Sequence, residues 1–158
     1  METDRLFDVQ LDASGLPTPA PIIAQERAVA ILDLLEENSF GLVGIEAAHG
    51  PYRLNLSIKE GRLVFDVRNE QDDPVHAFHL SLTALRQVIK DYFQICDSYY
   101  TAVKTLPPGQ IEAIDMGRRG IHNEGSRILL ERLKGKVNTD METARRLFTL
   151  IAALHFKG

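Results

Sequence analysis

The residues with the clearest capacity for chemistry lie in one segment, residues 111–126. Its polar side chains include those of Asp115, Arg118, Arg119, His122, Asn123, Glu124 and Ser126. Arginine pairs suit the binding of phosphate or carboxylate groups, and a histidine exchanges a proton near neutral pH. The segment also contains three glycines, each of which costs a helix about 0.5–1 kcal/mol relative to alanine. Such repeated departures from helical preference indicate a packing or functional requirement.

A helical arrangement of residues 110–134 places Arg118 among apolar side chains. The apolar sector contains Ile111, Ile114, Ile121, Gly125, Ile128 and Leu129, and a row of Asp115, Arg119, His122 and Ser126 follows its edge. A lone buried charge is very unfavourable, so Arg118 requires a carboxylate, backbone carbonyls or an anionic ligand. Asp91, at the edge of the apolar sector of the preceding helix, is the candidate partner. Asp115 and Arg119 are one turn apart and are expected to pair.

These residues support two interpretations. One is a polar pocket for a phosphate or carboxylate at a seam between helices, in which glycines allow a close approach. Its candidate ligand-binding residues are Arg118, Arg119, Asp115, Asn123, Ser126 and Asp91. The other is an internal Arg–Asp network that sets the helix register while the glycines allow tight packing. If the segment is catalytic, His122 is the candidate acid/base, and the arginines would hold the phosphate of a phosphorylated or RNA substrate.

Charge is unevenly distributed along the 158 residues. Residues 1–103 contain 8 Lys+Arg against 16 Asp+Glu, whereas residues 104–158 contain 10 against 6. The basic part is a candidate surface for a phosphate-bearing small molecule, an acidic protein partner or, weakly, nucleic acid; alternatively, the two parts neutralise each other within the fold. No apolar run approaches the roughly 20 residues of a membrane helix, so no membrane partner is expected.

Neither a metal site nor a cofactor is predicted. No two of the five histidines have the i,i+4 spacing of helical metal ligands, and His76 and His79 alternate across a strand. Phosphate-binding loops, dinucleotide fingerprints and nucleophile elbows are absent from the sequence. His155 is expected in the core and Cys96 as a buried structural thiol. A single cysteine and an acidic N-terminus without a signal-peptide pattern predict a cytoplasmic protein.

Hydropathy patterns predict a single domain, residues 1–158, of the α+β class. Residues 52–59, 62–68 and 75–80 alternate as strands do and indicate an antiparallel β-meander. With a candidate strand at 41–46, they form an antiparallel sheet of three to four strands. A short strand at 6–11 precedes them, and Glu60-Gly61 supplies a two-residue turn.

Helices are expected mainly in the C-terminal half, segregated against the sheet. The first of these carries an apolar sector from Leu82 to Val103, Pro107-Pro108-Gly109 separates it from the next, and Thr139-x-x-Glu142 is a capping box for the last. An earlier helix begins near Pro21. Its predicted inner stripe is Ala24, Ala28, Ile31, Leu32 and Leu35, and its predicted outward residues are Glu26, Asp33 and Glu37.

Five blocks of the sequence resemble UPF0262, an uncharacterised family of alphaproteobacterial proteins. The blocks are residues 26–31, 50–54, 91–93, 111–126 and 143–150. The resemblance implies a bacterial cytosolic protein and carries over no activity, cofactor or functional residue. The resulting prediction is a non-enzymatic binding or regulatory module. Its alternative is an enzyme that acts on a phosphorylated or RNA substrate through His122.

Overall fold

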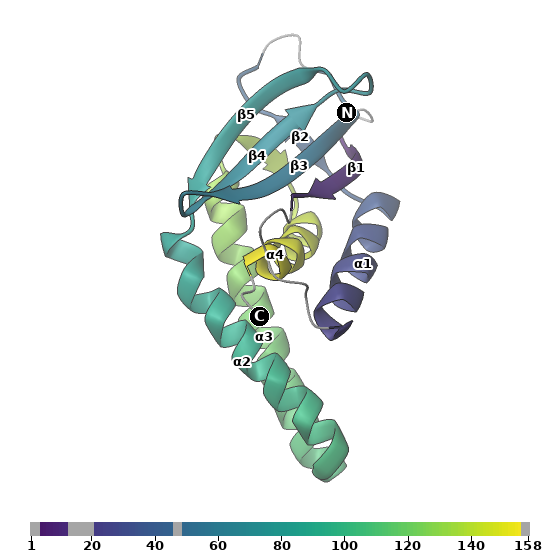
Figure 1. Ribbon diagram of the computed structural model, residues 1–158, viewed down its shortest axis with the longest axis vertical. Coiled ribbons are helices and arrows are strands. Elements are labelled where there is room, and N and C mark those ends of the chain that lie inside the picture. The colour runs from purple at the N-terminus through teal and green to yellow at the C-terminus, as the bar shows by residue number, and fades with distance from the viewer. Residues whose placement is uncertain (1–3, 13–20, 46–48, 156–158) are drawn as a thin grey trace.

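The computed structural model describes residues 4–12, 21–45 and 49–155, and these residues form an α+β fold (Figure 1). The elements in chain order are β1 (Leu6–Leu11), α1 (Pro21–Glu36), β2 (Phe40–Leu42), β3 (Tyr52–Lys59), β4 (Arg62–Arg68), β5 (Pro74–Ser81), α2 (Thr83–Thr105), α3 (Pro108–Leu133), β6 (Val137–Thr139) and α4 (Met141–His155). The predicted fold class is confirmed, and three of the four helices in this described part lie in the C-terminal half.

The main sheet has the strand order β1-β3-β4-β5. The predicted meander is confirmed, since β3–β4 and β4–β5 are antiparallel. The prediction of a wholly antiparallel sheet is wrong, because β1 pairs with β3 in parallel, with Leu6 opposite Tyr52 and Leu11 opposite Leu56. The chain passes through α1 and β2 between these two strands, which is the long crossover that a parallel pair requires.

The candidate fourth strand does not join this sheet. Instead, β2 pairs antiparallel with β6, and Phe40 lies opposite Thr139. A short strand pairs wherever the tertiary structure brings a second edge to it, which hydropathy near residue 41 does not reveal. The β2–β6 ladder thereby joins the end of α1 to the start of α4.

The β3–β4 hairpin follows its sequence pattern closely. Glu60 and Gly61 have φ angles of 54° and 74°, as both central residues of a type I′ turn require. Alternate side chains of both strands are buried: Tyr52, Leu54, Leu56, Leu63, Phe65 and Val67. This apolar face covers α4, which lies beneath the sheet between α1 and α3 (Figure 1).

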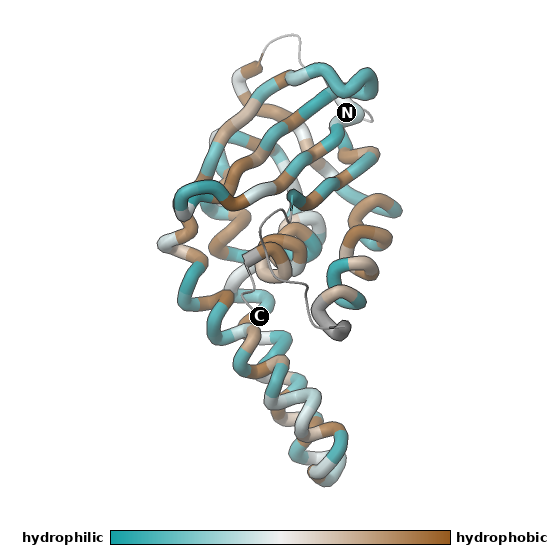
Figure 2. The backbone as a smooth tube through the Cα atoms, in the orientation of Figure 1, coloured by the Kyte–Doolittle hydropathy of each residue, from teal (hydrophilic) through white to brown (hydrophobic). Residues whose placement is uncertain are grey.

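Helices α2 and α3 form an antiparallel pair whose distal ends extend away from the body (Figure 1). The chain reverses at Pro107-Pro108, as predicted. Hydropathy along the distal part is mixed (Figure 2), and Val103, Leu106 and Met116 are exposed there. Among the helices described, none combines the length and the apolar character that crossing a bilayer requires.

The predicted inner face of α1 is only partly correct, because Ile31 and Leu35 pack against the core whereas Leu32 is 70% exposed. The buried residues of the described part of α1 are Ala30 and Leu34, and Val29 is exposed. Apolar residues occupy most sides of α1, so their periodicity does not select one face. The rotated helix directs Glu26 and Asp33, both predicted to face away, toward the other helices.

The N-terminus of α4 is capped by Asp140 rather than by Thr139. The Asp140 side chain accepts a hydrogen bond of 2.7 Å from the backbone N–H of Thr143. Thr139 belongs to β6, where its hydroxyl donates to the carbonyl of Ser39 at 2.6 Å. The motif therefore marks the helix start correctly, but the capping residue is one position later.

Candidate functional site

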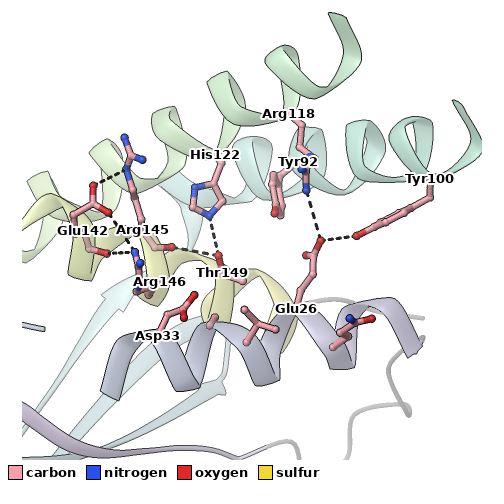
Figure 3. A pocket seen from close by; sticks show the side chains of 13 residues that line it. Glu26, Asp33, Tyr92, Tyr100, Arg118, His122, Glu142, Arg145, Arg146 and Thr149 are labelled. Atoms are coloured by element: carbon pink, nitrogen blue, oxygen red, sulfur yellow. Dashed lines mark hydrogen bonds and ion pairs between the residues drawn. The ribbon is translucent and has the colours of Figure 1, made fainter. Parts of the chain in front are cut away.

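A cleft of about 640 Å³ opens between the four helices (Figure 3). One wall is α1, and the other is formed by α2 and α3, with α4 between them. Its lining residues belong to α1, to the middle parts of α2 and α3, and to α4. Two residues of the predicted segment line it, Arg118 and His122, which are one turn apart on α3.

Arg118 is held in place by partners on three helices. Its guanidinium donates to Asp115 Oδ1 from Nη2 at 2.7 Å and from Nε at 3.2 Å. Its Nη1 lies 3.9 Å from Glu26 Oε1 on α1, and its Cζ lies 4.5 Å from the ring centroid of Tyr99 on α2. The hydrogen bond from Arg118 holds the pKa of Asp115 below its ordinary value. Arg118 is therefore a positioned cation at the edge of the cleft.

The prediction that Asp91 pairs with Arg118 is wrong. Asp91 accepts a hydrogen bond of 2.8 Å from Gln87 on its own helix. A carboxylate three residues before Arg118, Asp115, reaches the guanidinium instead, and this carboxylate also binds Arg119 at 2.7 Å as predicted. An Arg–Asp network is thus present, although it lies within α3 and not between helices.

Glu26 connects α1 with the α2–α3 pair. The hydroxyl of Tyr100 donates to Glu26 Oε1 at 2.7 Å, and Arg118 approaches the same oxygen (Figure 3). Burial, together with this hydrogen bond to Glu26, raises the pKa of Tyr100, which keeps the hydroxyl protonated as a donor. This connection forms one end of the cleft.

His122 is a neutral side chain in the wall of the cleft. Its Nε2 lies 2.8 Å from Thr149 Oγ1 on α4, and its ring packs edge-on against Tyr92 and Phe148. Burial, reinforced by the nearby positive charges of Arg145, Arg118 and Arg146, lowers the pKa of His122 to about 4. At neutral pH the imidazole is therefore a hydrogen-bonding group and not a cation.

At the other end of the cleft, two guanidinium groups share one carboxylate. Glu142 Oε2 lies 3.3 Å from Arg146 Nη1, and Glu142 Oε1 lies 3.6 Å from Arg145 Nε. The Nε of Arg145 is buried and makes no hydrogen bond within the described residues. The side chains of Arg145 and Arg146 are 38% and 32% exposed. This end of α4 therefore carries an excess of positive charge.

The remaining predicted site residues lie outside the cleft lining. Arg119 is 73% exposed, Asn123 is exposed, and Asp115 is behind Arg118. Ser126 is fully buried, and its hydroxyl donates to the His122 carbonyl at 2.7 Å. Of the predicted site residues on α3, Arg118 and His122 face the cleft, while the others support these two side chains or face solvent.

Sequence reasoning did not assign to this site the lining residues that α1, α2 and α4 contribute. These residues are Glu26, Asp33, Tyr92, Tyr100, Glu142, Arg145, Arg146 and Thr149. One signal was available: Arg145-Arg146 is an adjacent cationic pair, and Thr149 follows Arg145 by one turn. No local pattern shows that these residues meet Arg118 and His122 of α3, because they belong to other helices of the folded chain.

The structure also bears on the metal and thiol predictions. Across residues 4–12, 21–45 and 49–155, no three His, Cys, Asp or Glu side chains are grouped as metal ligands. Cys96 is a buried free thiol, as predicted, and burial raises its pKa to about 11. The side chain of His155, predicted in the core, lies outside the described residues.

Comparison with known proteins gives one consistent result. The model of an uncharacterised protein family, UPF0262, matches residues 3–157. A UPF0262 protein of Ruegeria pomeroyi is 62% identical over 161 residues, covering 100% of both chains. Another, from Cereibacter sphaeroides, is 60% identical over 156 residues, covering 97% of this chain and 99% of the relative. No solved structure matches the chain.

Proposed function

Since the chain belongs to the UPF0262 family, which is described only as uncharacterised, we propose a function from the cleft itself: non-enzymatic binding of a small molecule with a phosphate or carboxylate group. The observation that carries this proposal is the arrangement on α4. Arg145 and Arg146 share the single carboxylate of Glu142, and both side chains are partly exposed in the cleft. A small anion would supply the second negative charge that these two guanidinium groups lack.

The chemistry of the arginines supports this proposal. A guanidinium offers a planar set of donors that matches two oxygens of a phosphate or carboxylate. Arg118 is less available, because Asp115 and Glu26 already meet it. A structural network accounts for Arg118 and Arg119, but Arg145 and Arg146 retain a charge that Glu142 alone does not balance.

Thermal-shift measurements with inorganic phosphate, nucleotides, phosphorylated metabolites and small carboxylates test this proposal. We expect at least one class to raise the unfolding temperature in a saturable manner, because a ligand that binds only the native state stabilises it. R145Q/R146Q should abolish the shift. The matched control R119Q should retain it, since Arg119 is 73% exposed and lies outside the cleft. No shift with any ligand would remove the small-molecule form and leave an acidic protein partner.

An enzyme acting on a phosphorylated or RNA substrate is the second candidate function. It is favoured by the position of His122 in a cleft that is also lined by Arg118, Arg145 and Arg146. With a pKa of about 4, His122 would accept a proton in this role, and the arginines would hold the phosphate. Phosphoester and RNA turnover assays test it, and H122Q with the activity of the natural chain would exclude this role for His122.

We also propose that the protein acts as a single domain in the cytosol. Helix α4 contacts α1, α3 and β3, so it packs against two other helices and the main sheet. The one cysteine of the chain is a buried thiol, which suits a reducing compartment.

A further inference from the structure

Two sides of the cleft, formed by α1 and α4, carry opposite charges. Of the described α1 residues that line the cleft, none is basic, and two are acidic: Glu26 and Asp33. The opposite charge lies on α4, where Arg145 and Arg146 share Glu142. Figure 3 shows Asp33 on the α1 side of the cleft and the two arginines on the α4 side.

The acidic residues of α1 differ in what they already bind. Glu26 receives the hydroxyl of Tyr100 and faces Arg118. The Asp33 carboxylate makes no hydrogen bond or ion pair with any residue that the structure describes, although it lines the cleft. Among the described residues that line the cleft, one carboxylate on α1, Asp33, and one excess guanidinium charge on α4 remain after these internal pairs are formed.

These two remaining charges constrain what the cleft can bind. A purely anionic molecule at Arg145 and Arg146 would share the cleft with the Asp33 carboxylate, and like charges at close range repel. A molecule that also carries a cationic group would pair with the Asp33 carboxylate as well as with the two arginines. Resting on the proposed binding function, we propose that the ligand is a zwitterion, with its acidic group at Arg145 and Arg146 and its amine at Asp33.

Apolar groups of the cleft suit the short carbon spacer of such a molecule. They belong to Val29 and Ala30 of α1 and to the ring of Tyr92 on α2. A volume of about 640 Å³ lies within the range of small-molecule pockets, which commonly span ~300–1,000 Å³. An amino acid or an aminoalkyl phosphate has the required chemistry, because each has a protonated amine separated from an acidic group by a few carbons.

Two matched ligand pairs test the amine directly. β-Alanine differs from propionate, and phosphoethanolamine from ethyl phosphate, only by the amino group. NMR titration of the full chain gives each dissociation constant. We expect the amine-bearing member of at least one pair to bind about tenfold more tightly, and the better pair identifies the acidic group as carboxylate or phosphate.

Two variants assign the contacts. D33N should remove the tenfold preference by weakening the amine-bearing ligand, while the affinity of its amine-free partner is unchanged or improved. R145Q should weaken all four ligands. R119Q is the control for a loss of surface charge and should leave all four affinities unchanged. D33N keeps the size of the side chain, and its unfolding temperature without ligand checks that the fold is intact.

The outcomes separate the zwitterion proposal from the broader one. Equal affinities within both pairs, or a D33N variant that retains the preference, would overturn the zwitterion proposal and leave anion binding in place. If none of the four probes binds, or if R145Q binds them as the natural chain does, the zwitterion proposal is also overturned, and the assignment of anion binding to Arg145 fails with it.

Discussion

The two halves of α3 have the same helical backbone but are held by different interactions. In the half that packs on α4, Gly125, Ser126, Leu129 and Leu133 are buried. In the distal half, within the projecting α2–α3 pair, Met116 is 65% exposed, and no residue of that half is buried. The two α3 residues of the cleft lie where these halves meet. His122 packs against Phe148, and Arg118 is held by ion pairs.

The glycines make the contrast quantitative. A Cβ added at Gly125 would lie 2.3 Å from the ring of Phe148, whereas a Cβ at Gly120 would meet nothing within 4 Å. The same residue type therefore serves close packing at one position and has no packing role at the other. The cleft forms where dense packing changes to ion pairing, which leaves charged side chains both positioned and accessible.

The largest expected effect is that of G125A. The new methyl group would overlap the Phe148 ring, and overpacking a dense core costs about 3 kcal/mol when neighbours cannot move. Denaturant unfolding measures the loss. The G125A/F148L double variant should recover part of the stability, because leucine at position 148 leaves room for the new methyl group. A G125A protein as stable as the natural chain would show that the packed half of α3 is loose.

His122 is expected to make stability depend on pH. Its pKa is about 4 in the folded state and 6.5 when unperturbed, so the unfolded state binds more protons between these values. The stabilisation is complete above pH 6.5 and is lost as the pH falls toward 4. With solvent screening in an open cleft, we expect a loss of about 2 kcal/mol.

A comparison of the natural chain with H122Q isolates this effect. Unfolding free energies at pH 7.5, 5.5 and 4.5 should fall more steeply for the natural chain, because glutamine does not titrate. If the unfolding free energies of the two proteins changed with pH in the same way, the pKa of His122 would not be lowered by burial, and the side chain would be accessible to solvent.

The parts of the fold that could be predicted depend on residues close together in the sequence. The β3–β4 hairpin needs only alternation and Glu60-Gly61, and the reversal between α2 and α3 needs only Pro107-Pro108. The parallel β1–β3 pair and the β2–β6 ladder were not predictable in this way. Each joins strands separated by a long stretch of chain, and short strands take whichever partner the tertiary structure supplies.

The same limit applies to the candidate site. Arg118 and His122 could be identified because a helical wheel places both on one side of α3. Glu26 and Asp33 could not, since α1 is apolar on most sides and its orientation is set by packing on α4. The placement of α1 and α4 charges in one cleft depends on how the helices meet, and the periodicity of a single helix carries no information about that.

In the distal half, D115N should have a moderate effect. It removes the carboxylate that binds both Arg118 and Arg119, and partly exposed ion pairs contribute at most about 1 kcal/mol. R119Q is the control and should change the unfolding free energy very little, because its side chain is 73% exposed. If D115N cost as much as G125A, the distal half would be held as firmly as the packed half.

The smallest effect, and the only stabilising one, is expected for G120A. Alanine improves helix propensity by about 0.5–1 kcal/mol, and its methyl group at this position meets no neighbour. G117A should fall between the other two glycine variants, because its Cβ would lie 2.8 Å from the flexible end of Ile95. All three substitutions gain the same propensity, so the order G120A, G117A, G125A in unfolding free energy reports packing alone. A different order would contradict the inference that α3 is densely packed at Gly125 and loosely packed at Gly120.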